Sequence, residues 1–522
     1  LWSKQFFYYD VSSWLRGDPG QPKPPDSRWN LRNNGWQHFH AEEVLSMPDK
    51  WEYPWFASWD LAFQMVPFAL IDSKFAKDQL LLLVREWYMH PNGQIPAYEW
   101  NFEDVNPPVI AWACYRVFKM EHKRTGKKDL LFLSRMFHKL LLNFTWWVNR
   151  KDNNNHGVFE GGFLGLDNIG VFDRNMKLPN GARLAQSDAT SWMAMFCLNM
   201  LTLALELAIH DPAYEDTASK FFEHFIYIAE AMNKARSLWC KTENFYFDSI
   251  IFPNSAPQEL RIRSLVGLLP ILAVTTLEPD VLKSFTKFRR RMEWFIENRP
   301  QLCQNIDFSY GKDNEDRRVI LSLVPRERLV LVLEKMLAED QFLSPYGIRS
   351  LSLWHRDHPF DMTIDNQHYR CEYWPGESQS RMFGGNSNWR GPIWFPTTYL
   401  LIEALQKFDF YYSDALKVAC PTGSGKMMNL WDVSLELQRR MLTIFRRNSE
   451  GRRPVFGTSQ TMQTDPHWKD NILFYEYIHG CNGTGLGASH QTGWTGLVAK
   501  MIDQLQTAQN NSFKEPPTNG HK

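Results

Sequence analysis

Residues 190–209 read TSWMAMFCLNMLTLALELAI, a stretch that is apolar nearly all the way round a helix. A helix without a polar face has to be covered by protein on every side, so this segment is expected at the centre of a helical fold. Two other stretches differ in pattern. Residues 128–150 (KDLLFLSRMFHKLLLNFTWWVNR) and 219–235 (SKFFEHFIYIAEAMNKA) each have one apolar and one polar face.

The apolar face of residues 128–150 follows the helical period closely. It comprises Leu133, Met136, Phe137, Leu140, Leu141, Phe144 and Val148. Alternation of fully apolar and one-sided helices predicts two concentric helical layers, in which outer helices cover inner ones. The predicted class is therefore all-α. A large irregular all-α domain remains an alternative from this pattern alone.

The rest of the chain divides by composition. Residues 1–50 are polar and rich in Pro and Gly, which predicts a lead-in segment or linker. Residues 51–506 are predicted to form the helical domain, with long loops and a small β-containing insertion around 300–390. Residues 507–522 are predicted to be a disordered tail.

Composition narrows the class of partner. Lys plus Arg and Asp plus Glu are both 58, so a zero net charge makes nucleic acid and anionic membrane poor partners. The aromatic fraction is 15%, with 22 Trp. Trp offers a rigid apolar face and one donor, which suits stacking on sugar rings, but dense packing between large helices would also use it. Both readings stay open.

The motif search predicts neither a metal nor a cofactor. The seven cysteines are scattered without CxxC spacing, and His38 and His40 lack a third ligand at a metal-binding spacing. No dinucleotide, phosphate-loop or zinc-protease motif is present. Scattered thiols favour a reducing compartment such as the cytoplasm. The longest apolar run, 265–277, is too short to span a membrane, and a start at Leu1 leaves targeting open.

Two isolated acids carry the chemical prediction. Asp167 lies in the glycine-rich GGFLGLDNIGVFDRN (161–175), and Glu476 lies between aromatics in FYEYIHGCNGTGLGASHQTGWTGLV (474–498). Such a pair suits general acid/base hydrolysis of a glycosidic bond. Apolar neighbours should raise the pKa of Asp167, as a general acid needs, whereas the polar loop after Glu476 should keep it ionised as a general base.

Other polar and aromatic blocks are candidates for substrate binding. Asp60 follows Trp59 at the start of an apolar helix, so it either caps that helix or accepts sugar hydroxyls. Asn106 precedes a Pro-Pro pair and could line a polar pocket. In NSNWRGPIWF (386–395), Trp389 would be costly to expose, and Arg390 could pair with a catalytic carboxylate or bind substrate oxygens.

Together these blocks resemble glycoside hydrolase family 63, the family of processing α-glucosidase I and of mannosylglycerate and glucosylglycerate hydrolases. The resemblance spans residues 54–502 and rests on WDLAF, NPP, GLDN, NWRGPIW, YEYIHG and QTGWTGLV in this order. It implies an (α/α)6 barrel and hydrolysis of an α-linked terminal glucose, or a similar sugar, with inversion. By position it also implies Asp167 as general acid, Glu476 as general base, and substrate binding by Trp59, Asp60, Asn106, Trp389 and Arg390.

The chain also departs from the family pattern. Glucosidase I-like members tend to continue after the acid as DDYPR, whereas here Asp167 is followed by Asn168-Ile169-Gly170. An N-terminal β-rich domain is not part of this sequence. Two other functions also stay open: a trehalase-like disaccharide hydrolase, and a catalytically inactive carbohydrate-binding relative. The expected partner in each case is a sugar or oligosaccharide, and the oligomeric state is left open.

Overall fold

The computed structural model describes residues 4–49, 52, 55–152, 157–162, 164–174, 176–235, 238–303, 306–308, 318–385 and 387–512. Helices dominate this part of the chain, and the sheets within it have two or three strands each. The predicted helical fold is confirmed. Of the predicted disordered tail 507–522, residues 507–512 instead belong to a helix that ends at Ser512, and the remainder, like Phe163 of the 161–175 block, lies outside the described residues.

The α-helices fall into an N-terminal and a C-terminal group. The first group is α1 (Val11–Arg16), α2 (Ser58–Phe68), α3 (Ser73–Leu82), α4 (Ile110–Thr125), α5 (Leu130–Lys151), α6 (Ser187–Ala208) and α7 (Ala213–Glu230). The second group is α8 (Pro279–Ser284), α9 (Thr286–Asn298), α10 (Arg326–Met336), α11 (Phe395–Tyr412), α12 (Leu430–Thr443), α13 (Gln460–Thr464) and α14 (Val498–Ser512).

The innermost helical segments contact one another in a closed ring. Contacts run from α2 to α4, from α4 to α6, and from α6 to the short 3-10 helix η5 (Leu269–Leu272). They continue from η5 to α11, from α11 to the 3-10 helix η11 (Thr495–Leu497), and from η11 back to α2. The contact between η11 and α2 closes the ring, so residues from the beginning and the end of the helical part of the chain lie close together.

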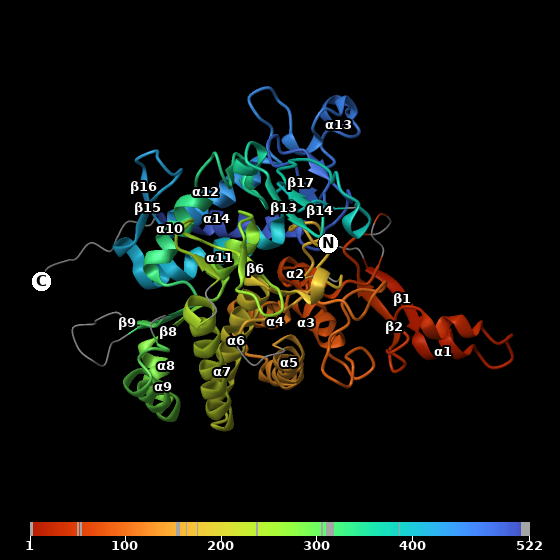
Figure 1. Cartoon of the computed structure of the whole chain (residues 1–522), viewed down its shortest axis with the longest axis horizontal. Coiled ribbons are helices and arrows are strands. Elements are labelled where there is room, and N and C mark those ends of the chain that lie inside the picture. The colour runs from red at the N-terminus through yellow and green to blue at the C-terminus, as the bar shows by residue number, and fades with distance from the viewer. Residues whose placement is uncertain are drawn as a thin grey trace, which may run out of the picture.

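Burial separates inner from outer helices as the sequence pattern predicted. Every residue of α2 and nearly every residue of α6 is buried, whereas α5 and α7 each bury one face. Figure 1 shows α5, α6 and α7 side by side, and α6 contacts both of the others. By length and composition α6 could cross a membrane, but 83% of its apolar window is buried inside the protein, as in a core helix.

The strands are short, with two to seven residues each in the part of the chain that the structure describes. Three-stranded sheets are formed by β3 (Arg183–Ala185), β6 (Asp248–Ile251) and β7 (Gln258–Leu260), and by β8 (Val274–Leu277), β10 (Val319–Ser322) and β9 (Ile306–Phe308). Antiparallel pairs are β4 (Trp239–Cys240) with β5 (Phe245–Tyr246), β11 (Leu343–Ser344) with β12 (Gly347–Ile348), β13 (Phe360–Ile364) with β14 (Gln367–Cys371), β15 (Lys417–Ala419) with β16 (Met427–Asn429), and β17 (Tyr477–Ile478) with β18 (Gly485–Leu486). Strands do occur within 300–390, although other parts of the chain carry them too.

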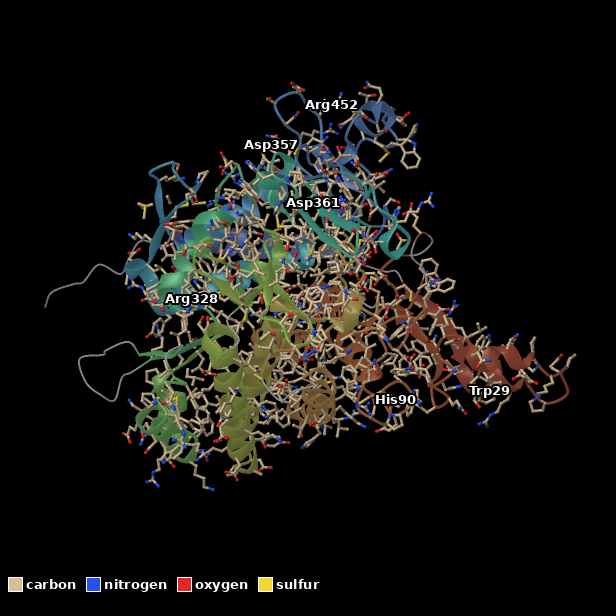
Figure 2. The ribbon with its side chains drawn as sticks, in the orientation of Figure 1. Trp29, His90, Arg328, Asp357, Asp361 and Arg452 are labelled. Atoms are coloured by element: carbon tan, nitrogen blue, oxygen red, sulfur yellow. The ribbon has the colours of Figure 1, made fainter. Side chains whose placement is uncertain are left out.

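The N-terminal segment has more structure than its polar composition predicted. β1 (Lys4–Asp10) pairs antiparallel with β2 (His40–Ser46) over its whole length, and α1 follows β1 directly. This unit projects at one side of the molecule in Figure 1, and Trp29 marks it in Figure 2. Several of its apolar residues, among them Phe7 and Trp36, are buried in the main core, whereas others such as Phe6 and Leu31 are exposed. Residues 4–46 are thus no bare linker, and the domain boundary near residue 50 stays a prediction.

Candidate functional site

One cavity of about 670 Å³ collects residues from distant parts of the chain. Its volume lies within the range of about 300–1,000 Å³ that small-molecule sites occupy. The described residues that line it include six of the seven predicted site residues: Trp59, Asp60, Asn106, Asp167, Trp389 and Glu476. The seventh, Arg390, is not among them.

The cavity has a closed inner end and an open mouth. At the inner end, Trp59, Asp60, Trp389, Trp394 and Trp494 are all buried. At the mouth, Glu52 and Trp100 are exposed and Trp55 is half-buried. Trp100 keeps 43% of its surface exposed, against 1% for Trp389, so a ligand would enter past Trp100.

Asp167 lies on the loop between α5 and α6. Gly165, two residues before it, has φ +68°, and a Cβ there would lie 2.7 Å from the Trp59 ring. Glycine therefore lets the loop approach Trp59 and bring Asp167 to the cavity. Burial raises the pKa of Asp167 to about 6, and the negative charges of Asp104 and Asp173 add to this. A hydrogen bond donated by the Ser387 hydroxyl to Oδ2 opposes the rise.

Glu476 precedes β17 and is held by the loop that returns after β18. Its backbone N–H donates to the Ala488 carbonyl at 2.8 Å, and the Ala488 N–H donates to Glu476 Oε2 at 3.1 Å. The Trp494 indole donates to the Glu476 carbonyl at 2.8 Å. Burial, with a smaller contribution from the negative charge of Asp167, raises the pKa of Glu476 to about 8.

This pKa differs from the expectation that polar neighbours keep Glu476 ionised. Gly480, Asn482 and Gly483 follow Glu476 in sequence, but the chain turns away through β17 and β18 before it returns at Ala488. The carboxyl instead shares the cavity with Asp167 and is half-buried. Sequence neighbours therefore predicted the wrong surroundings, and burial controls the titration of this group.

Asp60 lies in the first turn of α2 but does not cap it. Ala57 is the N-cap residue of α2, and no side-chain hydrogen bond caps that end of the helix. Asp60 Oδ2 accepts a hydrogen bond of 2.7 Å from the Gln491 amide. Burial, followed by the charge of Glu476, raises the pKa of Asp60 well above its usual value. A carboxyl of this kind, fixed at the inner end of a cavity, suits binding of sugar hydroxyls.

The inner end is built from packed indoles. The rings of Trp389 and Trp394 stack with centroids 3.8 Å apart and planes 5° apart. Trp494 meets Trp394 edge-on at 5.8 Å and Trp59 edge-on at 5.3 Å. These rings pack on one another and also line the cavity, so dense packing is one use of the high Trp content, and stacking on a sugar ring stays a prediction.

Arg390 lies behind the Asp167 loop rather than in the cavity. Its Nε donates to the Asn168 carbonyl and its Nη2 to the Gly170 carbonyl, both at 2.7 Å. Its guanidinium lies 4.6 Å from the ring centre of Trp374. Asn168 Oδ1 accepts the Trp389 backbone N–H at 2.6 Å, which ties the two segments together. Arg390 is therefore placed to hold the loop, and its predicted contact with a catalytic carboxylate does not occur among these bonds.

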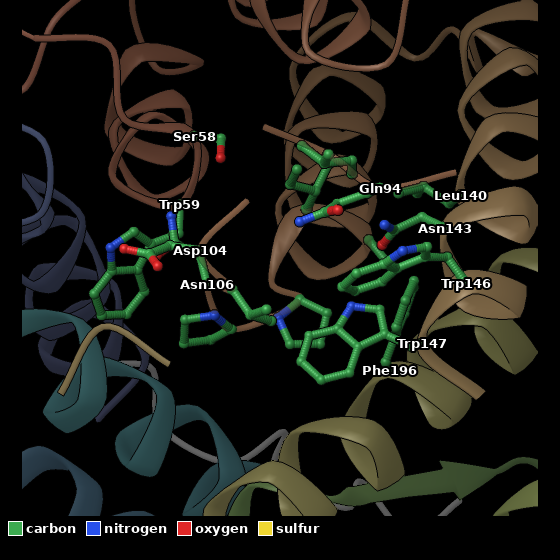
Figure 3. Close-up of a pocket in the computed structure, with 16 residues that line it drawn as sticks. Ser58, Trp59, Gln94, Asp104, Asn106, Leu140, Asn143, Trp146, Trp147 and Phe196 are labelled. Carbon is green, nitrogen blue, oxygen red and sulfur yellow. The ribbon is translucent and has the colours of Figure 1, made fainter. Parts of the chain in front are cut away.

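Asn106 lies between the site cavity and a much smaller one. Its amide donates to the Ala97 carbonyl at 3.2 Å, so one side of the group is fixed. The smaller cavity has about 30 Å³ and is lined by Trp59, Asn106, Asp104 and residues of α5, among others (Figure 3). That volume suits one or two water molecules and not a sugar.

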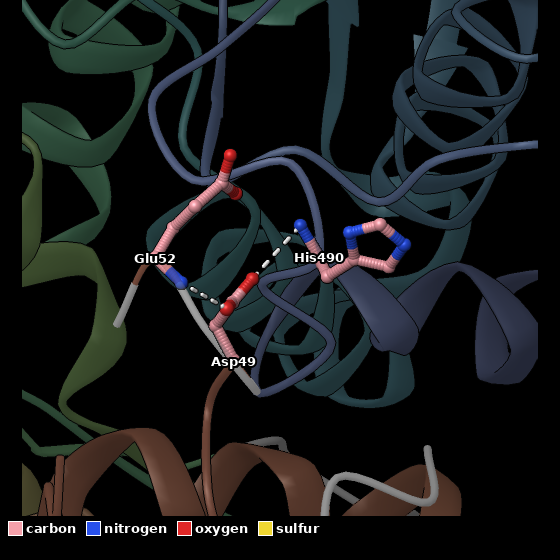
Figure 4. A group of neighbouring side chains, drawn as sticks. All are labelled: Asp49, Glu52 and His490. Atoms are coloured by element: carbon pink, nitrogen blue, oxygen red, sulfur yellow. Dashed lines mark hydrogen bonds between the residues drawn. The ribbon is translucent and has the colours of Figure 1, made fainter. Parts of the chain in front are cut away.

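The mouth is joined to the loop that carries Ala488. The His490 N–H donates to Asp49 Oδ2 at 3.0 Å (Figure 4). The Ser489 hydroxyl donates to Glu52 Oε2 at 2.7 Å. The Glu52 N–H also donates to Asp49 Oδ1 at 2.8 Å. One carboxylate oxygen each of Asp49 and Glu52 and one imidazole nitrogen of His490, the atoms that could bind a metal ion, lie within 4.8 Å of one another. Their hydrogen bonds fix one wall of the mouth.

Several lining residues were not predicted as site residues. Ser387 and Gln491 belong to the NSNWRG and QTGWTG blocks, so their position in recognised blocks was the available signal. The other lining residues that were not predicted, Glu52, Trp55, Tyr98 and Trp100, lie in the first part of the predicted helical domain. For these mouth residues, a cluster of aromatics was the available clue.

Comparison with known proteins finds similarity to glycoside hydrolases. Residues 53–297 match the family model of the mannosylglycerate hydrolase MGH1-like glycoside hydrolase domain. An uncharacterized protein of Saccharomyces cerevisiae is 54% identical over 523 residues, which cover 97% of this chain and 48% of that protein. A mannosyl-oligosaccharide glucosidase of the same yeast is 23% identical, over 35% of this chain and 16% of its own length. The chain thus spans about half or less of the curated relatives it matches.

The fold is also found among solved structures. The crystal structure of GH63 mannosylglycerate hydrolase from Thermus thermophilus in complex with glucose aligns with a TM-score of 0.54 and 14% identity. The alignment covers 88% of this chain and 95% of that one, and at this identity it speaks for the fold. The predicted resemblance to glycoside hydrolase family 63 is therefore confirmed, with residues 53–297 similar to the mannosylglycerate hydrolase MGH1-like glycoside hydrolase domain.

Proposed function

We propose that the chain is an inverting α-glycosidase that removes an α-linked terminal glucose from an oligosaccharide or small glucoside. The observation that carries this proposal is that Asp167 and Glu476, 309 positions apart (476 − 167), line one cavity. The aromatic inner end next to them suits a sugar ring, and the glycoside hydrolase domain gives the reaction class.

The proposed chemistry uses one proton donor and one proton acceptor. Asp167 donates its proton to the glycosidic oxygen while the bond from C1 to that oxygen breaks. Glu476 takes a proton from a water molecule whose oxygen attacks C1 from the opposite face. The product sugar has the inverted, β configuration. Such a pair is expected to have carboxyl groups about 6.5–9.5 Å apart, which leaves room for the water.

The other site residues have proposed binding roles. Asp60, fixed by Gln491, would accept hydroxyls of the terminal sugar, and Trp59 and Trp389 would contact its ring faces. Asn106 would bind a hydroxyl at the side of the cavity. Arg390 would act on the substrate only indirectly, through the loop carbonyls that it holds.

The pKa values constrain how the two acids share protons. The pKa is raised to about 8 for Glu476 and to about 6 for Asp167, so at neutral pH this pair holds one proton, which lies mainly on Glu476. General acid catalysis by Asp167 then requires this proton to move to Asp167 when substrate enters. If the proton stays on Glu476 instead, the two roles are exchanged. The pair titrates as a unit, and mutants with different leaving groups separate the two cases.

The open mouth bears on the alternatives. A trehalase-like enzyme would close around a second sugar, whereas Trp100 and Glu52 are exposed, which favours a substrate that extends out of the cavity. An inactive binding relative would have no use for two carboxyls with raised pKa values in one cavity. The closed ring of contacts from α2 to η11 supports the further proposal of an (α/α)6 barrel within residues 51–506.

The test is hydrolysis of α-glucosides, with the anomer of the released sugar followed by NMR. We expect β-glucose to appear first, and Asp167→Asn and Glu476→Gln to abolish turnover of unactivated glucosides. Glu327→Gln, an exposed acid on α10, is the matched control. Initial release of α-glucose would exclude inversion. Absence of hydrolysis across α-glucosides and α-mannosides would exclude a glycosidase acting on these sugars.

A further inference from the structure

We propose that the mouth of the site cavity selects an uncharged aglycone (the group to which the terminal sugar is attached), with Glu52 as the residue that disfavours anionic ones. This inference rests on the proposed glycosidase function. It separates the chain from an enzyme whose aglycone is glycerate, although the solved structures with this fold include mannosylglycerate hydrolases.

The charges around the cavity have one sign. Its described lining residues include four carboxylic acids, Glu52, Asp60, Asp167 and Glu476, and no Lys, Arg or His. A bound carboxylate ligand is normally met by Arg, Lys or several N–H donors, because an unpaired charge is costly to desolvate. Among these residues a glycerate group would meet no cationic side chain, and its neutral polar partners would be limited to Tyr98, Asn106, Ser387 and Gln491.

Glu52 lies at the end of the cavity where the aglycone is expected. The terminal sugar is expected at the buried inner end, so the aglycone lies toward the exposed mouth, where Glu52 is. The Glu52 carboxylate is fixed there because Ser489 donates to Oε2 through both its hydroxyl, at 2.7 Å, and its backbone N–H. A fixed charge discriminates better than a mobile one, since the ligand cannot push it aside at little cost.

The aromatic residues of the mouth suit a neutral sugar. Trp55 and Trp100 meet edge to face with centroids 5.7 Å apart, and Trp100 also lines the cavity. The nearby cation Arg32 stacks over the Trp100 ring at 3.9 Å and is not among the described lining residues. Arg32 therefore helps to hold the ring and does not offer the cavity a charge partner. Apolar sugar faces stack on such rings without needing one.

The experiment compares two substrates that differ in one group, 2-O-α-glucosylglycerol and 2-O-α-glucosylglycerate. We expect kcat/KM for the neutral compound to exceed that for the anionic one on the order of fivefold or more, the effect of one like charge at close range in water. The preference should shrink as salt is raised, because exposed charges are screened over about 8–10 Å. Equal rates, or a preference for the glycerate, would overturn the inference.

Two variants test whether Glu52 causes the preference for the neutral glucoside. Glu52→Gln removes the charge but keeps an oxygen acceptor for Ser489, so the preference should fall toward unity. Glu327→Gln should leave it unchanged. A preference that survives Glu52→Gln at full size would show that Glu52 does not cause it.

A further substrate and a binding measurement separate failure of this inference from failure of the proposed function. α-Glucosyl fluoride has almost no aglycone, so its hydrolysis reports the catalytic pair alone. If the fluoride is also inert, the proposed function fails. Titration calorimetry of both glucosides with Asp167→Asn still tests the inference in that case, since stronger binding of the glycerate compound would overturn it.

Discussion

The Ser387 hydroxyl donates a hydrogen bond to Oδ2 of Asp167 across 220 positions of sequence. This bond stabilises the ionised form of Asp167 and opposes the effect of burial on its pKa. The pKa of Asp167 is about 6 and that of Glu476 is about 8, so the pair holds one proton at pH values between the two. We expect kcat/KM to be bell-shaped with its maximum between them, because hydrolysis needs one acid and one base.

Ser387→Ala should move the acidic limb of this profile upward. Without the donated bond, the pKa of Asp167 rises, so the second proton binds at a higher pH and inactivates the pair earlier. The pH dependence of kcat/KM measures the shift, and Ser387→Thr, which keeps a hydroxyl, is the control. An acidic limb that stays in place in the alanine variant would contradict a role of Ser387 in tuning Asp167.

Leaving groups distinguish the roles of the two acids. Asp167→Asn should lose on the order of 10²–10⁴-fold in rate on unactivated glucosides and keep far more activity on α-glucosyl fluoride, which needs little protonation. Glu476→Gln should lose activity on both, and azide should partly restore it by attacking C1 to give β-glucosyl azide. The opposite pattern would assign the acid to Glu476, the group with the higher pKa.

Gly165→Ala should impair catalysis through the shape of the loop. Gly165 has φ +68°, and an added Cβ would lie 2.7 Å from the Trp59 ring. Such strain costs about 1–3 kcal/mol, so we expect kcat/KM to fall roughly tenfold or more as the loop shifts Asp167. Gly170→Ala is a matched control in the same loop, because nothing lies within 4 Å of a Cβ there. Equal activity of both variants would mean that the loop position is not critical.

Arg390→Gln should lower both stability and kcat. The Asn168 and Gly170 carbonyls would lose their guanidinium donors, and each buried unpaired group costs about 1–3 kcal/mol. Because Arg390 does not line the cavity, we expect kcat to fall more than KM changes. Calorimetry and steady-state kinetics measure the two effects, with the exposed Arg370→Gln as control. A large rise in KM with unchanged kcat would instead indicate direct substrate contact.

Glu476→Gln should make the protein more stable in mild alkali while removing activity. The folded state raises the pKa of Glu476 to about 8, so the folded protein holds this proton at a pH where the unfolded chain has released it. Stability from this group is therefore greatest at low pH and is lost as pH rises through about 8. We expect Tm of the variant to exceed that of the wild type at pH 9 by on the order of a few degrees, and to match it near pH 5.

The sequence predicted the parts of this structure that depend on periodicity and on local blocks. α6 is buried on all sides and α5 on one face, as their apolar spacing required. Asp167 and Glu476 were found because an acid between glycines or aromatics is unusual. Neither prediction needed knowledge of contacts between distant residues.

The features that were missed depend on such contacts. Arg390 sits beside Trp389 in sequence, but the two side chains lie on opposite sides of the segment, and spacing alone could not show which one lines the cavity. The surroundings of Glu476 are set by Ala488, which returns after β18, rather than by the next residues along the chain. Residues 4–46 appeared linker-like because of their polar, Pro- and Gly-rich composition, whereas their structure depends on the pairing of β1 with β2 and on contacts with the main core.

The complete burial of α6 has a consequence for synthesis of the chain. α4 and α5 are made before α6, but its partners α7 and η5 emerge from the ribosome later. Until then a 22-residue apolar helix has no complete cover. The nascent chain is then exposed to aggregation or to capture by chaperones, so slow translation between α6 and η5 would prolong its most vulnerable period.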